Sequence, residues 1–267
     1  MSIIIKNREY QIIKKLEETG FGPVFQVLDK LDKKYYAIKK LQLREDMEDM
    51  LQNYEREVEI LSNFNCENII KYYDSYRDNN NFYILMEYFS DRNLRDFVDR
   101  FRNRYELIEE KVLSHIIKQI CLIIKEIHSK KIVHRDIKPE NFFINENMDI
   151  KIGNFLISQY INTNEEYAQT LNKEGTIYYT APEIFEKGIY NAKSDMYSLG
   201  CVIYELFTLE NYYTDKYFND NVKKINEEYD PKWQEIIDSL LQIDNSKRMN
   251  INQVYDFIVK KEKTLNE

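Results

Sequence analysis

The side chains best suited to chemistry stand in one run of eight residues, the octet His134-Arg135-Asp136-Ile137-Lys138-Pro139-Glu140-Asn141. A carboxylate, an ammonium group and an amide oxygen follow one another closely there, so one loop could offer a proton acceptor, a fixed positive charge and a metal ligand. A second run, Asn154-Phe155-Leu156, follows thirteen positions after the octet ends. These two runs are the candidates for a functional site, and the other elements must position them.

The pattern of the chain changes near residue 90 from strand-like to helical. Short β-branched and aromatic runs separated by turn residues predict antiparallel strands in 10–13, 24–27, 35–39 and 69–88, with one helix at 44–63. Apolar residues at helical spacing predict helices at 108–129, 194–209, 231–242 and 250–261. The clearest apolar stripe consists of Val112, Ile116, Ile120, Ile123, Ile124 and Ile127. We therefore expect a small, mostly β part followed by a larger, mainly α part.

The octet matches the catalytic-loop signature of eukaryotic protein kinases, and three further segments match that family in register with it. They are Tyr36-Ala37-Ile38-Lys39, Arg56-Glu57-Val58-Glu59-Ile60-Leu61 and Gly175-Thr176-Ile177-Tyr178-Tyr179-Thr180-Ala181-Pro182-Glu183. The chain thus resembles a serine/threonine protein kinase, and the segments 72–76 and 86–88 look most like the NIMA-related branch. The resemblance implies an α+β, bilobal fold in one kinase domain, 8–263. Its small antiparallel β lobe with one main helix would be 8–88, and its larger, mainly α lobe 89–263.

The resemblance also assigns roles within the octet. Asp136 would accept the proton of the substrate hydroxyl, and Lys138 would neutralise charge on the transferred phosphoryl group. Asn141 would act beside them as a metal ligand. Because a tyrosine kinase would usually lack Lys138 at that spacing, the implied reaction is transfer of the ATP γ-phosphate to a protein serine or threonine.

A second set of residues is implied to bind ATP. Lys39 would contact the α- and β-phosphates and pair with Glu57 on the predicted helix. Taken without the octet, either residue would more often be a solvated surface charge. The residues implied around the nucleotide are Leu16, Val24, Ala37, Lys39, Glu57, Met86 as gatekeeper, Glu87, Phe89 and Phe143. Phe143 stands where the family usually has a smaller aliphatic residue, so we expect a shallower or partly filled pocket.

The sequence departs from the family where metal-bound phosphates are expected. Asn154 and Leu156 replace the Asp and Gly of the Asp-Phe-Gly motif, and the phosphate loop keeps only Gly22 of its three motif glycines, with Glu17 and Thr19 at the expected places of the first two. A neutral amide gives a hard cation a weaker field than a carboxylate. We therefore expect Asn141 to hold Mg²⁺ and Asn154 to bind it only weakly, with Mn²⁺ as an alternative ion.

These departures leave two interpretations open. The chain is either a serine/threonine kinase with weak or metal-atypical activity, or a catalytically inactive pseudokinase that acts as a nucleotide-binding switch or scaffold through a protein partner. The first interpretation is favoured because Lys39, Asp136, Lys138 and Asn141 are all present.

Regulatory and structural residues are implied as well. Arg135 would receive a phosphorylated residue of the activation segment, because a guanidinium binds phosphate through two parallel hydrogen bonds. Thr170 is the first candidate for that phosphorylation, and Thr176 would hydrogen-bond near the octet. Two structural contacts are also expected: an ion pair of Glu183 with Arg248, and anchoring of the octet backbone by Asp195.

Composition limits the partners. The chain has 267 residues and a formal net charge of −8, which argues against nucleic-acid binding as its main role. No uncharged run approaches the roughly 18 residues of a membrane span, and no signal peptide is recognised. The three cysteines lack any Cys-x-x-Cys spacing, so we expect buried thiols. The expected partner is a protein substrate or regulator and the expected location is cytoplasmic, with the nucleus as the alternative, while the oligomeric state stays open.

Overall fold

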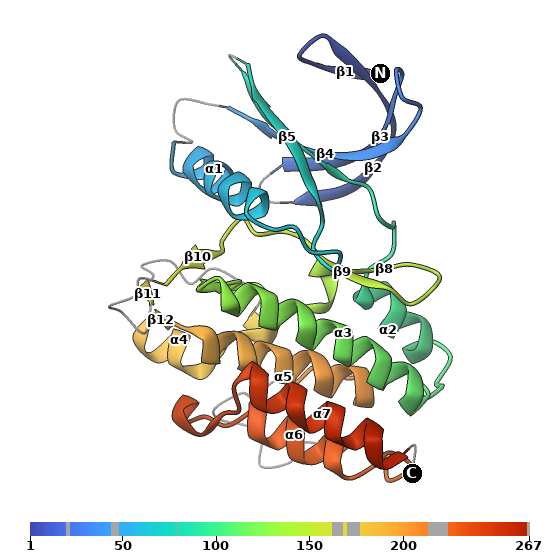
Figure 1. Cartoon of the computed structure of the whole chain (residues 1–267), viewed down its shortest axis with the longest axis vertical. Helices are drawn as coiled ribbons and strands as arrows, with labels where there is room; N and C mark the ends of the chain where they lie inside the picture. Colours follow the sequence, from blue (N-terminus) through green and yellow to red (C-terminus); the bar gives the residue numbers. More distant parts are fainter. Residues whose placement is uncertain are drawn as a thin grey trace. The chain divides into compact units, whose positions relative to one another are not determined.

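The computed structural model of the chain describes residues 1–19, 22–43, 48–78, 80–161, 168–169, 177–212 and 224–265. They group into two compact units (Figure 1). The first unit is made of Met1–Asp91 together with Gly153–Leu156. The second is made of Arg92–Ile152 together with Ile157–Glu267. The second candidate run of the sequence therefore belongs to the β-rich first unit although it follows the octet in the chain.

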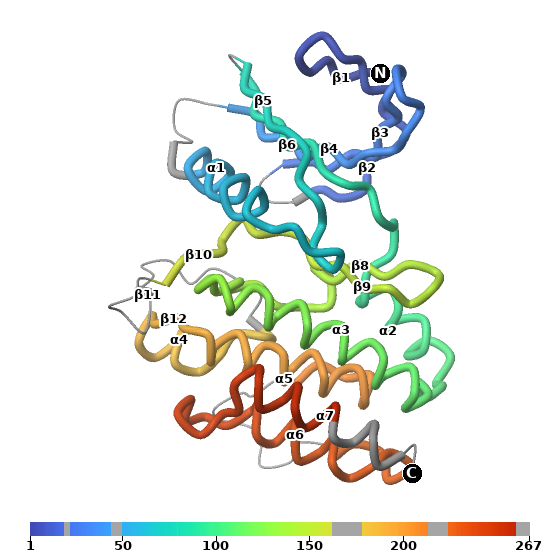
Figure 2. The backbone as a smooth tube through the Cα atoms, in the orientation of Figure 1, coloured from blue at the N-terminus to red at the C-terminus, as the bar shows by residue number. Residues whose placement is uncertain are grey.

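The first unit is built on one antiparallel sheet, whose strands run from blue to cyan in Figure 2. The order of the strands across the sheet is β1-β2-β3-β4-β6-β5. Their bounds are β1 (Ser2–Ile5), β2 (Arg8–Thr19), β3 (Gly22–Asp29), β4 (Tyr35–Gln42), β5 (Tyr72–Arg77) and β6 (Asn81–Glu87). The strands expected in the first part of the sequence are thus present; β2, β3 and β4 are longer than predicted, and β5 and β6 lie within the predicted range 69–88. β1 precedes residue 8 and was not foreseen.

β1 is joined to β2 by a two-residue turn. Lys6 and Asn7 have φ values of 47° and 66°, as a type I′ hairpin turn requires, and Asn is among the side chains that tolerate this region best. The Lys6 ammonium group contacts both carboxylate oxygens of Asp74 on β5, at 2.8 and 2.7 Å. Since β1 and β5 are the two edge strands, this ion pair links opposite edges of a curled sheet.

One hydrophobic core of this unit lies on a face of the sheet. Its buried members are Ile3, Ile5, Tyr10, Val27, Ile38, Tyr83 and Leu85. Helix α1 (Glu48–Ser62) stands where a helix was predicted at 44–63. Tyr54 of α1 is fully buried and makes a T-shaped ring contact with Phe82 of β6, with ring centroids 6.1 Å apart. This packing fixes the helix face that carries Glu57.

The second unit is mainly helical. Its helices are α2 (Leu94–Arg102), α3 (Glu110–Ser129), α4 (Pro182–Lys187), α5 (Ala192–Thr208), α6 (Lys232–Leu240) and α7 (Ile251–Leu265). Its short strands are β7 (Ile132–Val133), β8 (Phe142–Ile144), β9 (Ile150–Ile152), β10 (Gln159–Tyr160), β11 (Ala168–Gln169) and β12 (Ile189–Tyr190). 3₁₀ turns occupy Pro139–Asn141, Ile177–Tyr179 and Asn245–Lys247. A sheet-based unit and a helical unit confirm the predicted α+β class.

α5 forms the centre of the second unit and packs against α3 and α6 (Figure 1). Every residue from Ser194 to Phe207 is buried. On α3, five of the six residues of the predicted stripe are buried, whereas Val112 is half-buried and Leu113 takes the core-facing position. No helix within the described ranges is both long and apolar enough to cross a membrane.

Helices α2 and α5 each begin at a capping box, which fixes the position of their first turns. Asn93 caps α2 by accepting from the backbone of Asp96, whose side chain accepts from the Asn93 backbone in return. Asn191 and Ser194 make the equivalent pair at the start of α5. Such reciprocal caps satisfy backbone N–H groups that have no partner within the helix. They also set the start of the two helices that carry side chains of the candidate site.

The two structural contacts expected from the sequence are confirmed. Arg248 donates to both oxygens of Glu183, at 2.6 and 2.7 Å, and both residues are buried. Asp195 accepts from the backbone N–H groups of His134 and Arg135, at 2.9 and 3.0 Å. One contact ties α4 to the loop before α7, and the other ties α5 to the octet.

Replacing Arg248 by Ala is expected to lower the free energy of unfolding of the helical unit by about 3–5 kcal/mol, because it leaves the buried carboxylate of Glu183 without its cation. The measurement is urea denaturation followed by the fluorescence of Trp233, the chain's one tryptophan, which is buried in α6. Lys247→Ala is the matched control, with a side chain 70% exposed and an expected change within about 0.5 kcal/mol. Equal effects of the two substitutions would contradict the prediction.

Candidate functional site

The candidate site in the first unit centres on an ion pair between β4 and α1. Lys39 Nζ lies 2.7 Å from Glu57 Oε2, and the two residues are 3% and 1% exposed. The ammonium group also lies 5.0 Å from the centre of the Tyr54 ring. Burial, and then the charge of Glu57, raise the pKa of Tyr54, so this hydroxyl keeps its proton. The ammonium group of the buried Lys39 is thus paired with one carboxylate and faces one aromatic ring.

The segment Gly153–Leu156 adds to this ion pair within the same unit. The second carboxylate oxygen of Glu57, Oε1, accepts from the backbone N–H of Phe155 at 3.0 Å. Lys39 Nζ donates to Asn154 Oδ1 at 3.4 Å. Asn154 has φ 62°, a left-handed conformation that Asn and Asp tolerate better than other side chains. The amide therefore keeps the backbone shape and the contact with Lys39, while its charge is lost.

The residue after Phe155 departs further from the glycine expected there. Leu156 is 1% exposed, so its side chain is part of the packed interior. The ring of Phe155 lies 5.6 Å from that of Phe64. Replacing the expected glycine has therefore added an apolar anchor to this segment.

The register of the sheet brings several expected nucleotide residues onto one face. Val24 on β3 pairs with Lys39 on β4, and Ala37, two residues before Lys39, pairs with Met86 on β6. Residues paired across strands, and residues two apart along one strand, point to the same face. Leu16 falls at an irregularity of β2, between Lys15 and Glu17.

Two further positions frame this sheet face. Gly22 has φ +125°, and a Cβ atom there would lie 2.2 Å from the carbonyl oxygen of Lys40, so only glycine fits. Glu87 ends β6, and its backbone N–H donates to the carbonyl oxygen of Lys71 at 2.8 Å. Phe89 follows β6 as a half-buried side chain.

Phe143 belongs to the second unit, where β8 pairs with β9 and Phe143 forms a bridge with Asn93.

The candidate site in the second unit is the octet. Lys138 Nζ lies 3.0 Å from Asp136 Oδ2, and Asn141 Nδ2 donates to the same oxygen at 2.9 Å and to the Asp136 carbonyl at 2.6 Å. The 3₁₀ turn Pro139–Asn141 folds the amide of Asn141 back onto Asp136. The nitrogen of that amide faces Asp136, so its oxygen is the atom that could be offered to a metal ion. The structure thus brings the three predicted residues together, while their joint action stays a prediction.

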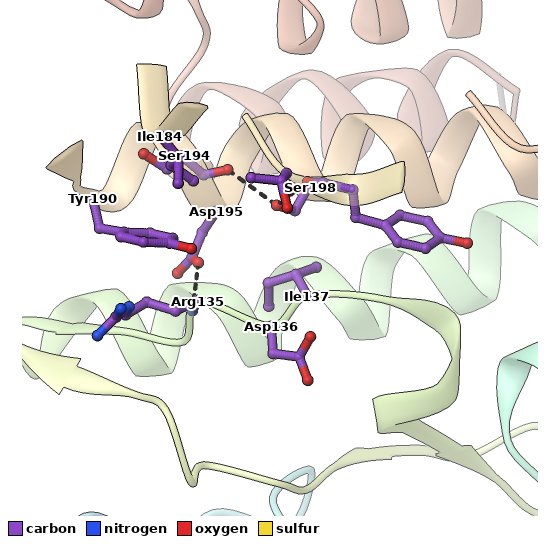
Figure 3. A pocket seen from close by; sticks show the side chains of 10 residues that line it. Arg135, Asp136, Ile137, Ile184, Tyr190, Ser194, Asp195 and Ser198 are labelled. Carbon is purple, nitrogen blue, oxygen red and sulfur yellow. Dashed lines mark hydrogen bonds between the residues drawn. The ribbon is translucent and has the colours of Figure 1, made fainter. Parts of the chain in front are cut away.

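The octet backbone is held in an unusual shape. Arg135 has φ 70°, and the Asp195 carboxylate accepts the consecutive backbone N–H groups of His134 and Arg135. His128 Nε2 lies 2.9 Å from the same carboxylate. Figure 3 shows Asp195 reaching from α5 to the backbone of Arg135 beside a cavity of about 10 Å³, close to the space of one water molecule.

Arg135 is 7% exposed, and its guanidinium carbon lies 4.3 Å from the centre of the Tyr190 ring on β12 (Figure 3). A guanidinium stacked in this way keeps its charge while its flat face is covered. Thr170, the candidate for phosphorylation, and Thr176, expected to hydrogen-bond near the octet, both lie outside the described residues. The regulatory role of Arg135 stays a prediction.

A charged cluster beside the octet was missed by sequence reasoning. Glu205 on α5 is 0% exposed and binds Arg95 and Arg102 of α2, while Arg95 also binds Glu140 of the octet at 2.9 Å. The signal was present in the sequence. Glu205 interrupts the otherwise apolar run 199–207 of α5, and an acid in that setting is seldom buried unless a cation pairs with it.

Metal ligands are sparse. Within the described ranges, no cluster of three or more His, Cys, Asp or Glu residues is placed to hold a metal ion. The expected ligand Asn154 belongs to the first unit and Asn141 to the second. Both offer amide oxygens, which suit Mg²⁺ in type but carry less charge than carboxylates.

Comparison with known proteins places the chain in a family. The serine/threonine-protein kinase Nek1 of Mus musculus is 36% identical over 203 residues, which cover 76% of this chain and 16% of that protein. The probable serine/threonine-protein kinase nek2 of Dictyostelium discoideum is 33% identical over 265 residues, 94% of this chain and 63% of the relative. The serine/threonine-protein kinase Nek5 of Homo sapiens is 32% identical over 255 residues, which cover 92% of this chain and 36% of that protein. The chain thus spans less than two thirds of each of these relatives, and the predicted likeness to NIMA-related kinases is confirmed.

The family model described as the protein kinase domain matches residues 10–257. This range contains the octet, the Lys39–Glu57 ion pair and the Asn154 segment. Because the match takes in most of the chain, the chain belongs to the protein kinase domain family.

Proposed function

We propose that this protein is a serine/threonine protein kinase that transfers the γ-phosphate of ATP to a protein hydroxyl group with weakened metal dependence. The observation that carries the proposal is the cluster in which Lys138 and Asn141 contact the carboxylate of Asp136 at 3.0 and 2.9 Å. Its members supply a proton acceptor, a cation for the transferring group and an amide oxygen. Relatives named as serine/threonine-protein kinases support the same reaction class.

Within this proposal the first unit binds the nucleotide. The buried Lys39 carries a positive charge suited to phosphate oxygens, and Glu57 fixes its direction. Val24, Ala37 and Met86 share a sheet face with Lys39 and would contact the apolar base. The donor set fits a nucleotide because it combines an oriented cation with an apolar surface. We assign Leu16, Glu87 and Phe89 to the same nucleotide by the register of the motifs, and Phe143 of the second unit stays a prediction from the sequence.

Within the octet, Asp136 orients the substrate hydroxyl and takes its proton. Lys138 lies 3.0 Å from that carboxylate and would place positive charge beside the transferring group. Asn141 would hold one Mg²⁺ ion through its amide oxygen and Asn154 would hold a second ion weakly. A bound metal ion would shield the negative charge of the phosphates.

A second candidate function rests on one observation, that Asn154 and Leu156 replace the expected acid and glycine. Leu156 is fully packed, and Asn154 contacts Lys39 without adding charge. These features also suit a pseudokinase that binds ATP and acts through a protein partner.

We place either protein in the cytoplasm, with the nucleus as the alternative, because Cys66, Cys121 and Cys201 are free thiols.

The role of Asp136 is tested with Asp136→Asn. We expect the rate of phosphate transfer to a serine-containing protein to fall about 10²- to 10⁴-fold, because the proton acceptor is lost. ATP affinity should change less than about threefold. Asp149→Asn, an exposed carboxylate in the same unit, is the control and should keep the native rate. Transfer that survives in Asp136→Asn would refute the assignment.

The role of Asn154 is tested with Asn154→Asp. Since aspartate also tolerates the left-handed backbone, the change adds charge with little strain. We expect tighter Mg²⁺-dependent ATP binding by calorimetry and a transfer rate higher by about 10²- to 10³-fold. Asn147→Asp adds the same charge at an exposed position of the second unit and should change neither quantity. Undetectable transfer by both the native protein and Asn154→Asp, with ATP still bound, would favour the pseudokinase.

The role of Lys39 is tested with Lys39→Met. We expect the affinity for ATP to fall at least about tenfold, because charge-assisted hydrogen bonds to the phosphates are lost. Lys40→Met is the matched control, since Lys40 neighbours Lys39 on β4 and its ammonium group faces the Tyr83 ring at 5.8 Å. Circular dichroism checks that both variants are folded. Equal ATP affinities of the two variants would show that Lys39 does not contact the nucleotide.

A further inference from the structure

The buried acid Glu205 is surrounded by donors from three parts of the second unit. Arg95 contacts both of its carboxylate oxygens, with Nη2 3.1 Å from Oε2. Arg102 Nη2 donates to Oε1 at 2.8 Å, and the Tyr179 hydroxyl donates to Oε2 at 2.5 Å. When its amide nitrogen faces the acid, Asn211 donates to Glu205 Oε1 at 2.7 Å and to Oε2 at 3.2 Å. Glu205 is thus the buried acceptor at the centre of a polar cluster in the helical unit.

Arg95 connects Glu205 to Glu140 of the octet. Its Nε donates to Glu140 Oε1 at 2.9 Å, while its two other nitrogens bind Glu205, and Nη2 also contacts the hydroxyl of Tyr179. The side chains of Arg95 and Glu140 are 19% and 36% exposed, whereas that of Glu205 is fully buried. One guanidinium therefore bridges a carboxylate at the surface and a carboxylate beneath it, and uses all three of its nitrogens.

Arg95 offsets part of the negative charge of this cluster. Glu140 and Glu205 carry two negative charges, and Arg102, the other cation at Glu205, is shared with Asp99. Although burial lowers the pKa of Arg95, its hydrogen bonds to Glu205 and Glu140 outweigh that effect and raise it, so the guanidinium stays charged. Burial and the charge of Glu205 raise the pKa of Tyr179, which therefore acts as a donor. Without Arg95 the surface next to the octet would be an acidic pocket.

We propose that Arg95 fills the acidic pocket of Glu140 and Glu205 as a built-in basic ligand, so that the protein substrate is selected without an arginine or lysine facing Glu140. This inference rests on the proposed kinase function, since it concerns the peptide bound beside the octet. Glu140 stands two residues after Lys138, so a peptide whose hydroxyl reaches Asp136 passes close to it. Arg95 is thus a specificity-determining residue that satisfies in advance the carboxylates that would otherwise bind a basic side chain.

The position of Arg95 is set by the start of α2. The capping box of Asn93 and Asp96 fixes the first turn of the helix, in which Arg95 is the second residue. Five residues further on, Arg100 is exposed and lies on the same helix. Arg100 therefore offers a control of equal charge that makes none of these contacts within the described residues.

The test measures peptide binding by isothermal titration calorimetry. Serine peptides with one arginine, placed in turn at each position flanking the serine, are compared with peptides that carry citrulline, the neutral analogue of arginine, at that position. We expect the native protein and Arg100→Ala to bind each pair with affinities within about twofold of each other. We expect folded Arg95→Ala to prefer arginine by about tenfold or more at one position, as for a new charge-assisted pair. Ratios of kcat/KM for transfer to the same peptides should follow the binding ratios.

Arg95→Ala leaves Glu205 buried without its main cation, so the double variant Arg95→Ala/Glu205→Gln is measured in parallel, with folding followed by Trp233 fluorescence. It should keep a preference for arginine of severalfold through Glu140, and adding Glu140→Gln should abolish that preference. A folded Arg95→Ala variant that binds no peptide, or binds both kinds equally, would overturn the proposal. So would a native protein that already prefers arginine tenfold through Glu140. Because binding needs no turnover, a native protein without transfer activity would count against the proposed function and not against this inference.

Discussion

The octet depends on one buried carboxylate, that of Asp195. The backbone at Arg135 is left-handed, a conformation that costs on the order of 1–3 kcal/mol for such a residue and persists only where its surroundings enforce it. Asp195 enforces it by accepting the N–H groups of His134 and Arg135, and α5 holds Asp195 in a wholly buried stretch that begins at a capping box. The positions of Asp136 and Lys138 are therefore set by helix packing rather than by the loop that carries them.

The first unit uses a carboxylate in the same way. Glu57 directs Lys39 with one oxygen and holds the backbone of Phe155 with the other. Asn154 keeps the left-handed turn and the contact to Lys39 that an aspartate could also make, but it lacks the charge. Geometry and electrostatics are thus separable at this position, because backbone shape depends on side-chain size and local hydrogen bonding while metal affinity depends on charge. This separation explains how a packed site can coexist with a weakened metal ligand.

Two buried carboxylates of the second unit are each paired with an arginine. Glu183 with Arg248 ties α4 to the loop before α7, and Glu205 with Arg95 connects the core to Glu140 at the octet. An unpaired charge at any of these places would be costly. Such pairs can therefore change what the neighbouring surface attracts, since a carboxylate bound to an internal arginine no longer draws a basic side chain from outside.

The sequence by itself determined the fold class, the family and the residues of the octet. Helical and strand periodicity is local, so α1, α3 and α5 lie near their predicted positions, and motif register predicted the pairings of Lys39 with Glu57 and of Glu183 with Arg248. Only the tertiary structure decided the rest. β1 and its ion pair across the sheet edges, the left-handed Asn154 and the bridge made by Arg95 all join residues far apart in the chain or depend on φ values. Contacts of this kind arise from how elements pack, and a linear pattern records only which side chains are available to make them.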